Sequence, residues 1–464
     1  MAFTVSDAAA ACGGISYGPE AEAARAWRCD SREVRAGDGF AAIRGAKTDG
    51  HLYIKQAAEQ GARVVLAERE GLEGAGIRPE DFPGVSFIVT ERRTEEALAL
   101  AASEYLRCVA PKTIAITGSV GKTTTRELTA AALAQRYKVH SAVRSFNTII
   151  GCALTVLSMA EETEALVLEL GTNHFGEIAE MVKYFPPETV IITEVAPAHL
   201  EGFGSVCGVL RAKLEICGSA KLKKIIFNCD NALLREAVSH NYDNVIKIGV
   251  GREAGAEISI EECRVALSEG GPSTSVRCRE AGREITLSAP LFGEQHAYNM
   301  CFALAAAESC GVSAQETARG FAAMAQLGGR GLCRRTARGV WVIDEAYNAN
   351  PASMRAAIRN ARAAAESLGL RKCAALGGMR ELGESAPEWH REILEAAACF
   401  DSVLLLGDEW KECGAPLADN FTLCASLDEL VSRALEESAK GGLILVKGSN
   451  SYGLKKAVAA LTEE

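Results

Sequence analysis

One stretch, residues 113–128, constrains the fold more than any other part of the chain. It reads TIAITGSVGKTTTREL, an apolar run that leads into Gly118, Gly121 and Lys122 and then into a segment of helical character. The backbone amides of a glycine-rich turn at a helix N-terminus form a cradle for anions. The usual spacing G-x-x-x-x-G-K-[ST] would need a glycine at position 116, where this chain has Ile116. The sequence therefore predicts a shortened phosphate-binding loop, G-x-x-G-K-T.

The order of the apolar runs predicts an α/β protein of three domains. Residues 1–110 alternate short strands and helices and should form a small N-terminal α/β domain. Residues 111–327 contain TIAIT, ALVLEL, TVIIT and KIIFN, each followed by an amphipathic segment, which indicates a central P-loop domain with a doubly wound, mostly parallel sheet. Alternating residues between about 245 and 292 predict antiparallel strands appended to that sheet. Residues 328–464 predict a Rossmann-like C-terminal α/β domain.

Composition argues against several classes of protein. The 464 residues carry a net charge of -10 and contain no long basic cluster, so nucleic-acid binding is not expected. No apolar run reaches the length of a membrane span, and the N-terminus, which has Asp7 and no basic region, does not resemble a secretory signal. The 16 cysteines form no C-x-x-C pair, which leaves a zinc ribbon without support. We expect a cytoplasmic, monomeric enzyme with reduced thiols.

Several polar residues should meet at the carboxyl edge of the central sheet. Lys122 is placed to contact the β- and γ-phosphates, and Thr123 to bind Mg²⁺ through its hydroxyl. Glu169 ends the run ALVLEL and His199 follows the next strand, so both fall at the same edge. The sequence predicts a helix around Lys213. This residue is either a solvated lysine or, if carbamylated by CO₂, an anion that could bind a metal ion.

Two further stretches carry polar residues suited to a nucleotide site. His296 and Asn299 stand three residues apart near the start of a helix and share one face. The run GVWVIDEAYNANPASM ends a strand with Asp344 and then places Asn348 and Asn350 before a helix led by proline. These asparagines could bind a base or cap the helix, and the sequence leaves both roles open.

On these motifs the chain resembles the Mur ligase family over nearly all of its length. The stretches TGSVGKTTT, PAHLEGFGS, RAKLEI and YNANPASM carry the resemblance, and the short G-x-x-G-K-T loop is the family's own version. The resemblance implies an ATP-dependent, ADP-forming acid–amino-acid ligase of peptidoglycan precursor synthesis, and so of cell-wall biogenesis. Its implied substrates are UDP-N-acetylmuramoyl-tripeptide and D-alanyl-D-alanine, joined through an acyl phosphate.

The resemblance also implies roles for individual residues. Those implied for ATP binding are Gly118, Ser119, Val120, Gly121, Lys122, Thr123, Thr124, His296, Asn299, Arg330, Asp344, Asn348 and Asn350. Two Mg²⁺ sites are implied, with the ligands Thr123, Glu169, His199 and a carbamylated Lys213. Those implied as catalytic are Lys122, Glu169, His199, Lys213 and Arg330, the last reaching the γ-phosphate after domain closure. Those implied for the UDP-linked peptide are Ser31, Arg32, Gly45, Asp49, Asn147, Thr148, Asn173 and His174.

Three positions depart from the family's pattern. Thr148 stands where a second asparagine is usual, Gly378 in LGGMRELG where an acid is usual, and Asn450 in KGSN where an arginine is usual. Two of the three fall in the domain that should hold the incoming amine. If neighbouring charged residues compensate, D-alanyl-D-alanine remains the preferred amine with a raised Michaelis constant. The neighbours that could compensate are Arg380, Glu381 and Lys447.

Three rival functions remain open. The chain could be a related ligase that uses a different amine or acid, a rival supported by Gly378 and Asn450. It could be a non-catalytic scaffold that binds nucleotide, although it retains the residues implied as catalytic. It could be a plain phosphate-loop ATPase or kinase, against which the missing glycine at position 116 counts.

Overall fold

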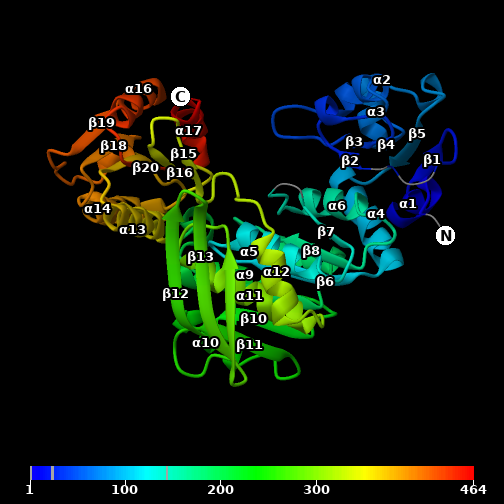
Figure 1. Ribbon diagram of the computed structural model, residues 1–464. Coiled ribbons are helices and arrows are strands. Elements are labelled where there is room, and N and C mark those ends of the chain that lie inside the picture. The colour runs from blue at the N-terminus through cyan, green and yellow to red at the C-terminus, as the bar shows by residue number, and fades with distance from the viewer. Residues whose placement is uncertain (1–2, 22–23, 25, 143–144, 464) are drawn as a thin grey trace.

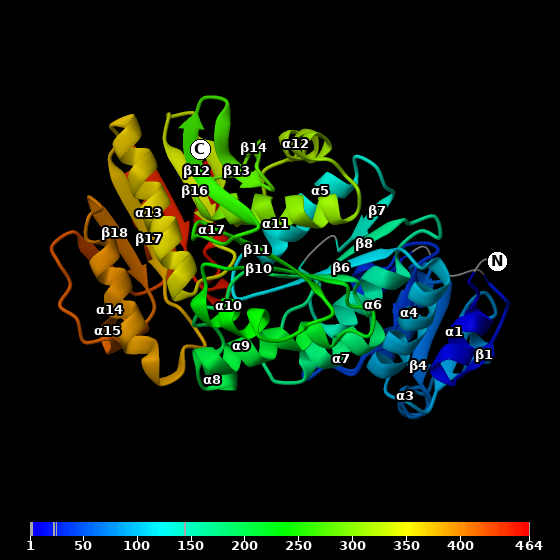
Figure 2. The same cartoon turned by 90° about the horizontal axis from the view of Figure 1, so that it is seen from below.

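The computed structural model describes residues 3–21, 24, 26–142 and 145–463, which form three sheets of five, nine and six strands. The predicted fold class, three α/β units with antiparallel strands appended to the central sheet, is confirmed. In Figures 1 and 2 the N-terminal and C-terminal units stand apart, at opposite ends of the central one. Among the described residues, no helix combines the length and apolar character needed to cross a membrane.

The N-terminal sheet has the order β1-β5-β4-β3-β2, in which only β1 runs antiparallel to its neighbour. Its strands are β1 Ile15–Tyr17, β2 Trp27–Arg28, β3 Gly39–Ala41, β4 Val64–Glu68 and β5 Ser86–Thr90. Its helices are α1 Val5–Cys12, α2 Ile54–Glu59, α3 Arg69–Ala75 and α4 Thr94–Val109, with the 3₁₀ turns η1 Ser31–Glu33, η2 Gly50–Tyr53 and η3 Pro79–Asp81.

The central sheet has the order β14-β13-β12-β11-β10-β9-β6-β8-β7. Its strands are β6 Lys112–Thr117, β7 Val139–Ser141, β8 Ala165–Glu169, β9 Thr189–Ile192, β10 Lys224–Asn228, β11 Ile246–Gly251, β12 Ile258–Ser268, β13 Gly271–Glu280 and β14 Arg283–Ala289. Its helices are α5 Lys122–Leu133, α6 Ile149–Leu157, α7 Glu177–Tyr184, α8 Leu200–Phe203, α9 Val206–Leu214, α10 Ala232–Ser239, α11 Gln295–Ser309 and α12 Ala314–Ala322, with η4 Glu215–Gly218.

The change from parallel to antiparallel pairing comes later than the sequence predicts. The sequence predicts antiparallel strands from about residue 245, but β11 is parallel to both β10 and β12, and the reversal comes at the hairpin of β12 and β13. Helix α10 connects β10 to β11 and supplies the crossover that parallel neighbours require. The hairpin extends toward the C-terminal unit (Figure 1), where Leu267 of β12 joins the core of that unit.

The C-terminal sheet has the order β15-β16-β20-β17-β18-β19, and all neighbours except β15 and β16 are parallel. Its strands are β15 Leu332–Arg335, β16 Trp341–Glu345, β17 Lys372–Gly377, β18 Ser402–Leu406, β19 Phe421–Cys424 and β20 Leu443–Lys447. Its helices are α13 Pro351–Leu368, α14 Ala386–Ala397, α15 Glu409–Glu412, α16 Leu427–Ser438 and α17 Lys455–Thr462, with η5 Gly383–Ser385 and η6 Asn450–Tyr452.

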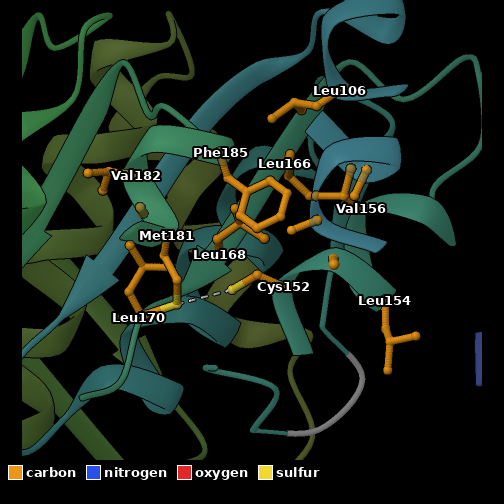
Figure 3. Packing of buried hydrophobic residues seen from close by; sticks show 14 of the residues in the cluster. Leu106, Cys152, Leu154, Val156, Leu166, Leu168, Leu170, Met181, Val182 and Phe185 are labelled. Atoms are coloured by element: carbon orange, nitrogen blue, oxygen red, sulfur yellow. Dashed lines mark hydrogen bonds between the residues drawn. The ribbon is translucent and has the colours of Figure 1, made fainter. Parts of the chain in front are cut away.

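The core beneath one face of the central sheet continues into the N-terminal unit. Figure 3 shows Leu106 of α4, Cys152 of α6 and Met181 of α7 around the strand β8. Phe185, directly after α7, lies fully buried among them. Since α4 closes the N-terminal unit and packs on α6, the two units share one hydrophobic core, which fixes the strand that ends in Glu169.

Phe185→Ala should lower the free energy of unfolding by about 3–5 kcal/mol, because it leaves a cavity in this shared core. Phe175, whose exposed fraction is 40%, supplies a matched control, and Phe175→Ala should cost much less. Chemical denaturation of both variants measures the difference. Equal losses would contradict the placement of Phe185 at the centre of the core.

Candidate active site

A cavity of about 1020 Å³ lies between the central and C-terminal units. It is lined by the phosphate loop, by residues that follow other strands of the central sheet, and by a loop of the C-terminal unit. From the predicted ATP and metal residues it gathers Ser119, Val120, Gly121, Lys122, Thr123, Thr124, Glu169, His199, His296, Asn299, Arg330, Asn348 and Asn350. The sheet edges therefore bring together residues that lie more than 200 positions apart in the sequence.

The glycines of the loop are required by its close contacts. Gly118 and Gly121 have positive φ angles of 147° and 87°, and a Cβ at Gly118 would lie 2.1 Å from Thr193 Oγ1. The Thr193 hydroxyl instead donates to the carbonyl of Val120 at 2.5 Å. Lys122 opens α5, and its Nζ donates to the carbonyl of Gly118 at 2.7 Å. The loop is thus folded around its own lysine.

Glu169, the last residue of β8, joins three separate elements. Its Oε2 accepts a hydrogen bond from the Thr123 hydroxyl at 2.7 Å, and its Oε1 accepts one from Asn147 Nδ2 at 3.2 Å. Arg126 Nη1 lies 3.5 Å from Glu169 Oε2, and both side chains are 2% exposed. The sequence motifs do not single out Arg126, although an arginine one turn after Lys122 on the same helix is a readable signal.

His199 links the central unit to the C-terminal one. Its backbone is left-handed, with φ 53°, and its Nδ1 contacts the carboxylate of Glu381, itself at φ 64°. The amide of Leu200 donates to the carbonyl of Glu381 at 2.9 Å. Burial lowers the pKa of His199, while the carboxylate of Glu381 opposes that shift. Two residues in uncommon backbone conformations therefore meet where the units touch.

Lys213 of α9 is 1% exposed and lies behind the cavity lining. Within the described residues its Nζ has no hydrogen-bond or ion-pair partner. Burial, reinforced by the positive charge of Lys122, lowers the pKa of Lys213 well below its ordinary value. The prediction of a solvated lysine is therefore wrong, and the amine is held in a site that disfavours its protonated form.

His296 and Asn299 share one face of α11, as predicted, and both are buried. Asn299 Nδ2 lies 3.2 Å from His296 Nδ1, and Asn299 Oδ1 accepts a hydrogen bond from the Thr125 hydroxyl at 3.2 Å. Burial lowers the pKa of His296 to about 4, so the imidazole is neutral near pH 7. A Cβ at Gly121 would lie 2.8 Å from Asn299 Oδ1, which ties α11 closely to the phosphate loop.

The C-terminal loop brings Arg330 to the cavity. The Arg330 guanidinium stacks over the ring of Tyr347 at 4.1 Å, and its Nη2 lies 3.4 Å from Ser145 Oγ of the central unit. Asp344 does not line the cavity, because its two carboxylate oxygens accept the amides of Gly329 and Ala346 at 2.9 and 3.0 Å. It shapes the loop that carries Arg330.

The two loop asparagines take different positions. Asn350 Oδ1 accepts the amide of Ser353 at 2.9 Å and caps α13, so the capping role left open by the sequence is present. Asn348 Oδ1 accepts the amide of Ala349 at 2.9 Å, and the Asn348 carbonyl accepts a bond from Lys447 Nζ, also at 2.9 Å. Both asparagines still border the cavity.

The residues predicted for the UDP-linked peptide are divided among several places. Asn147 lines the cavity, whereas Thr148 caps α6 by accepting the amide of Gly151 at 3.3 Å. Asn173 and His174 lie on the exposed turn that follows β8. The remaining four lie in the N-terminal unit, away from the cavity: Ser31, Arg32, Gly45 and Asp49.

A further group of polar residues lines the cavity outside the motifs of the sequence. Asp230 accepts a hydrogen bond from the Tyr298 hydroxyl at 2.5 Å, and Asn228 Nδ2 donates to Glu194 Oε2 at 2.7 Å. Burial raises the pKa of Glu194. Glu194 follows β9 and Asn228 ends β10, so the rule that located Glu169 at a strand's carboxyl edge would also have found them.

Comparisons with known proteins agree with this architecture. Residues 26–105, 116–307 and 329–450 match the family descriptions "Mur ligase family, catalytic domain", "Mur ligase middle domain" and "Mur ligase, glutamate ligase domain". The chain is similar to the UDP-N-acetylmuramoyl-tripeptide–D-alanyl-D-alanine ligases of Bacillus subtilis and Escherichia coli. Each is 31% identical over 446 residues, which covers 94% of this chain and 92% and 93% of those chains.

Solved structures show the same fold. MurF from Acinetobacter baumannii superposes with a TM-score of 0.83 at 24% identity, covering 100% of this chain and 99% of that one. MurF from Thermotoga maritima, solved in complex with ADP, superposes with a TM-score of 0.79 at 26% identity, covering 95% of this chain and 98% of that one.

Lys213→Met should raise the free energy of unfolding by about 1–3 kcal/mol in buffer free of CO₂ and Mg²⁺, because it removes a buried amine that has no partner in the described structure. Lys183→Met, at an exposed position of α7, is the matched control and should change stability little. Denaturant titration measures both. A Lys213→Met protein less stable than wild type would show that the amine contributes favourably to folding.

Proposed function

Because the chain belongs to the Mur ligase family, we propose that it is the ATP-dependent ligase that joins D-alanyl-D-alanine to UDP-N-acetylmuramoyl-tripeptide. The observation that carries this proposal is that relatives bearing this activity in their names match 94% of the chain. In this proposal residues 1–110 hold the UDP-linked peptide, residues 111–327 hold ATP, and residues 328–464 hold the amine. The enzyme acts as a cytoplasmic monomer in peptidoglycan precursor synthesis and uses no nucleic acid.

The reaction has two bond-forming steps. A carboxylate oxygen of the peptide attacks the γ-phosphorus of ATP, ADP leaves, and an acyl phosphate forms. The amine of the dipeptide then attacks the acyl carbon, phosphate leaves, and the nitrogen gives up a proton. Lys122 sits inside the loop where the β- and γ-phosphates would lie, and its charge offsets the charge that gathers during phosphoryl transfer. Arg330 reaches the same cavity from the C-terminal unit.

The donor set around Glu169 suits magnesium. The Thr123 hydroxyl and the Glu169 carboxylate are oxygen donors 2.7 Å apart at the phosphate loop, and Mg²⁺ is usually held by one or two such groups together with substrate phosphates. When bound, the ion neutralises phosphate charge. A second ion would need His199, whose Nδ1 is held by Glu381. Its other ring nitrogen would then serve as the ligand.

The function is tested by measuring phosphate release with UDP-N-acetylmuramoyl-tripeptide, ATP and a panel of amines. We expect release to require both the peptide and an amine, with D-alanyl-D-alanine giving a larger kcat/KM than single amino acids or other dipeptides. A different amine that wins by more than about tenfold would keep the ligase class and reject this substrate. Phosphate release without any amine would indicate an ATPase.

Lys122→Ala tests the role of the phosphate loop in the same assay. Its turnover should fall by on the order of 10²–10³ because it loses a charge at the transferring phosphoryl group. Its thermal melt should stay close to that of wild type, since the Lys122 side chain hydrogen-bonds within the loop and is not part of a hydrophobic core. Turnover near that of wild type would remove Lys122 from the proposed catalytic set.

We further propose that Lys213 is carbamylated in the active enzyme. Its neutral amine attacks the carbon of CO₂, an N–C bond forms, and the nitrogen releases a proton to leave an anion. Burial favours the neutral amine that this reaction needs. The product would turn the repulsion between Lys213 and Lys122 into attraction and would supply an anionic oxygen ligand for the proposed second metal ion.

The carbamate should give a ¹³C resonance in enzyme equilibrated with ¹³C-bicarbonate, and Lys213→Ala should abolish that signal together with nearly all turnover. Short carboxylic acids such as acetate should partly restore turnover to Lys213→Ala, because they can occupy the space of the missing anion. Lys183→Ala, which removes an exposed lysine, should retain both the signal and activity. A fully active wild-type enzyme without the resonance would contradict the modification.

A further inference from the structure

The carboxylate of Glu409 lies against Gly378, the position where an acid is missing. A Cβ built on Gly378 would lie only 2.6 Å from Glu409 Oε2. Gly407, at the end of the neighbouring strand β18, is equally close, since its Cβ would lie 2.5 Å from the same oxygen. A carboxylate is therefore present at the expected edge of the C-terminal sheet, but it comes from α15, one strand away from β17.

The carboxylate of Glu409 forms an ion pair with Arg380. Its Oε1 lies 2.8 Å from Nη1 of Arg380, and its Oε2 accepts a hydrogen bond from the Tyr452 hydroxyl. The Arg380 guanidinium also lies over the Tyr452 ring at 4.9 Å. The backbone before Arg380 is fixed as well, because the amide of Met379 donates to Nε2 of the buried His390 at 3.0 Å.

Of these two charged side chains, Arg380 is accessible to a substrate and Glu409 is not. Both oxygens of Glu409 are already engaged, and its side chain is only 12% exposed. The Arg380 side chain is 55% exposed and carries five N–H donors, and in the described part of the chain only its Nη1 lies against a carboxylate, that of Glu409. An arginine fixed at one nitrogen with others free is suited to bind a carboxylate through two parallel hydrogen bonds.

Arg380 also lies close to the site of the reaction. The next residue, Glu381, contacts His199 at the edge of the central sheet, and a Cβ on Gly383 would lie 3.9 Å from Cγ of Glu201. A molecule whose carboxylate met Arg380 would therefore be held at the junction of the two units. A dipeptide presents its amine at the opposite end from its carboxylate, so this contact leaves the nucleophile directed away from the arginine.

We propose that Arg380, held by Glu409 across Gly378, is the residue that binds the carboxylate of the incoming dipeptide. The inference rests on the proposed function and names the part of the chain that selects the amine. Glu409 is in this view a positioning residue, which replaces the acid expected at position 378. Arg380 makes the contact with substrate.

The test compares D-alanyl-D-alanine with D-alanyl-D-alaninamide, which has the same amine and no carboxylate. Arg380→Ala should raise KM for the free dipeptide by about ten- to hundredfold and leave KM for the amide and for ATP unchanged. Arg380→Lys should restore part of the preference for the free acid. Glu409→Gln should act in the same direction as Arg380→Ala but less strongly, with little change in kcat at saturating dipeptide.

Arg362→Ala removes an equally exposed arginine of the same unit, paired with Glu366 on α13, and should leave all constants unchanged. An Arg380→Ala enzyme that keeps the wild-type preference for the free acid over the amide would overturn the proposal. If the wild-type enzyme uses neither compound while it does use another amine, the proposed function fails instead, so the two failures are distinguishable.

Moving the carboxylate from position 409 to position 378 tests whether Glu409 positions Arg380. Gly378→Asp alone should raise KM for the dipeptide, because its Cβ would displace the Glu409 carboxylate and add a second negative charge. Gly378→Asp combined with Glu409→Ala should recover to within about threefold of wild type, since an acid again lies beside Arg380. A double variant that melts like wild type but binds the dipeptide as weakly as Glu409→Ala would show that Glu409 is not the replacement.

Discussion

The buried carboxylate of Glu169 is the interaction on which the rest of the site depends. It accepts a hydrogen bond from Thr123 at the start of α5 and one from Asn147, and it pairs with Arg126. Burying a carboxylate raises the free energy of the folded state unless the group is paired and hydrogen-bonded. The arrangement of three segments is therefore limited to one that gives Glu169 these partners: the phosphate loop, the segment before α6 and the end of β8. The fold thereby fixes the group proposed to bind magnesium before any ligand arrives.

Three lysine side chains at or near the cavity are largely shielded from solvent. Lys122 lies within the loop, Lys213 lies behind it, and Lys447 reaches the loop of Asn348 from β20. Burial lowers the pKa of each lysine, and only Lys447 has a carboxylate partner, Glu345, at 3.4 Å among the described residues. Phosphate oxygens of a bound nucleotide would neutralise the charge of Lys122, whereas the carbamylation proposed above would remove that of Lys213.

Several contacts join the central and C-terminal units around the cavity, and two of them involve residues proposed to act in the reaction. Arg330 reaches Ser145, and Glu381 contacts His199. Both contacts pair a residue proposed to act on ATP or metal with a partner from the other unit. The amine-side residue Arg380 precedes Glu381 directly, so the same short loop that touches the catalytic edge also carries the group proposed to select the amine. Arg380, the proposed amine contact, is thereby linked through Glu381 to His199, the proposed metal ligand.

The sequence by itself determined the three α/β units, the parallel strands β6, β8, β9 and β10 of the central sheet, and the loop from Gly118 to Thr123. These follow from local periodicity and from the geometry of a strand, a tight turn and a helix. It also placed Glu169 at a strand end. Only the tertiary structure decided that Asp344 shapes a loop and does not face the cavity, that Lys213 is buried, and that Glu409 fills the space beside Gly378. Side-chain contacts between strands that are distant in the sequence depend on how sheets and domains pack, and no spacing along the chain encodes that packing.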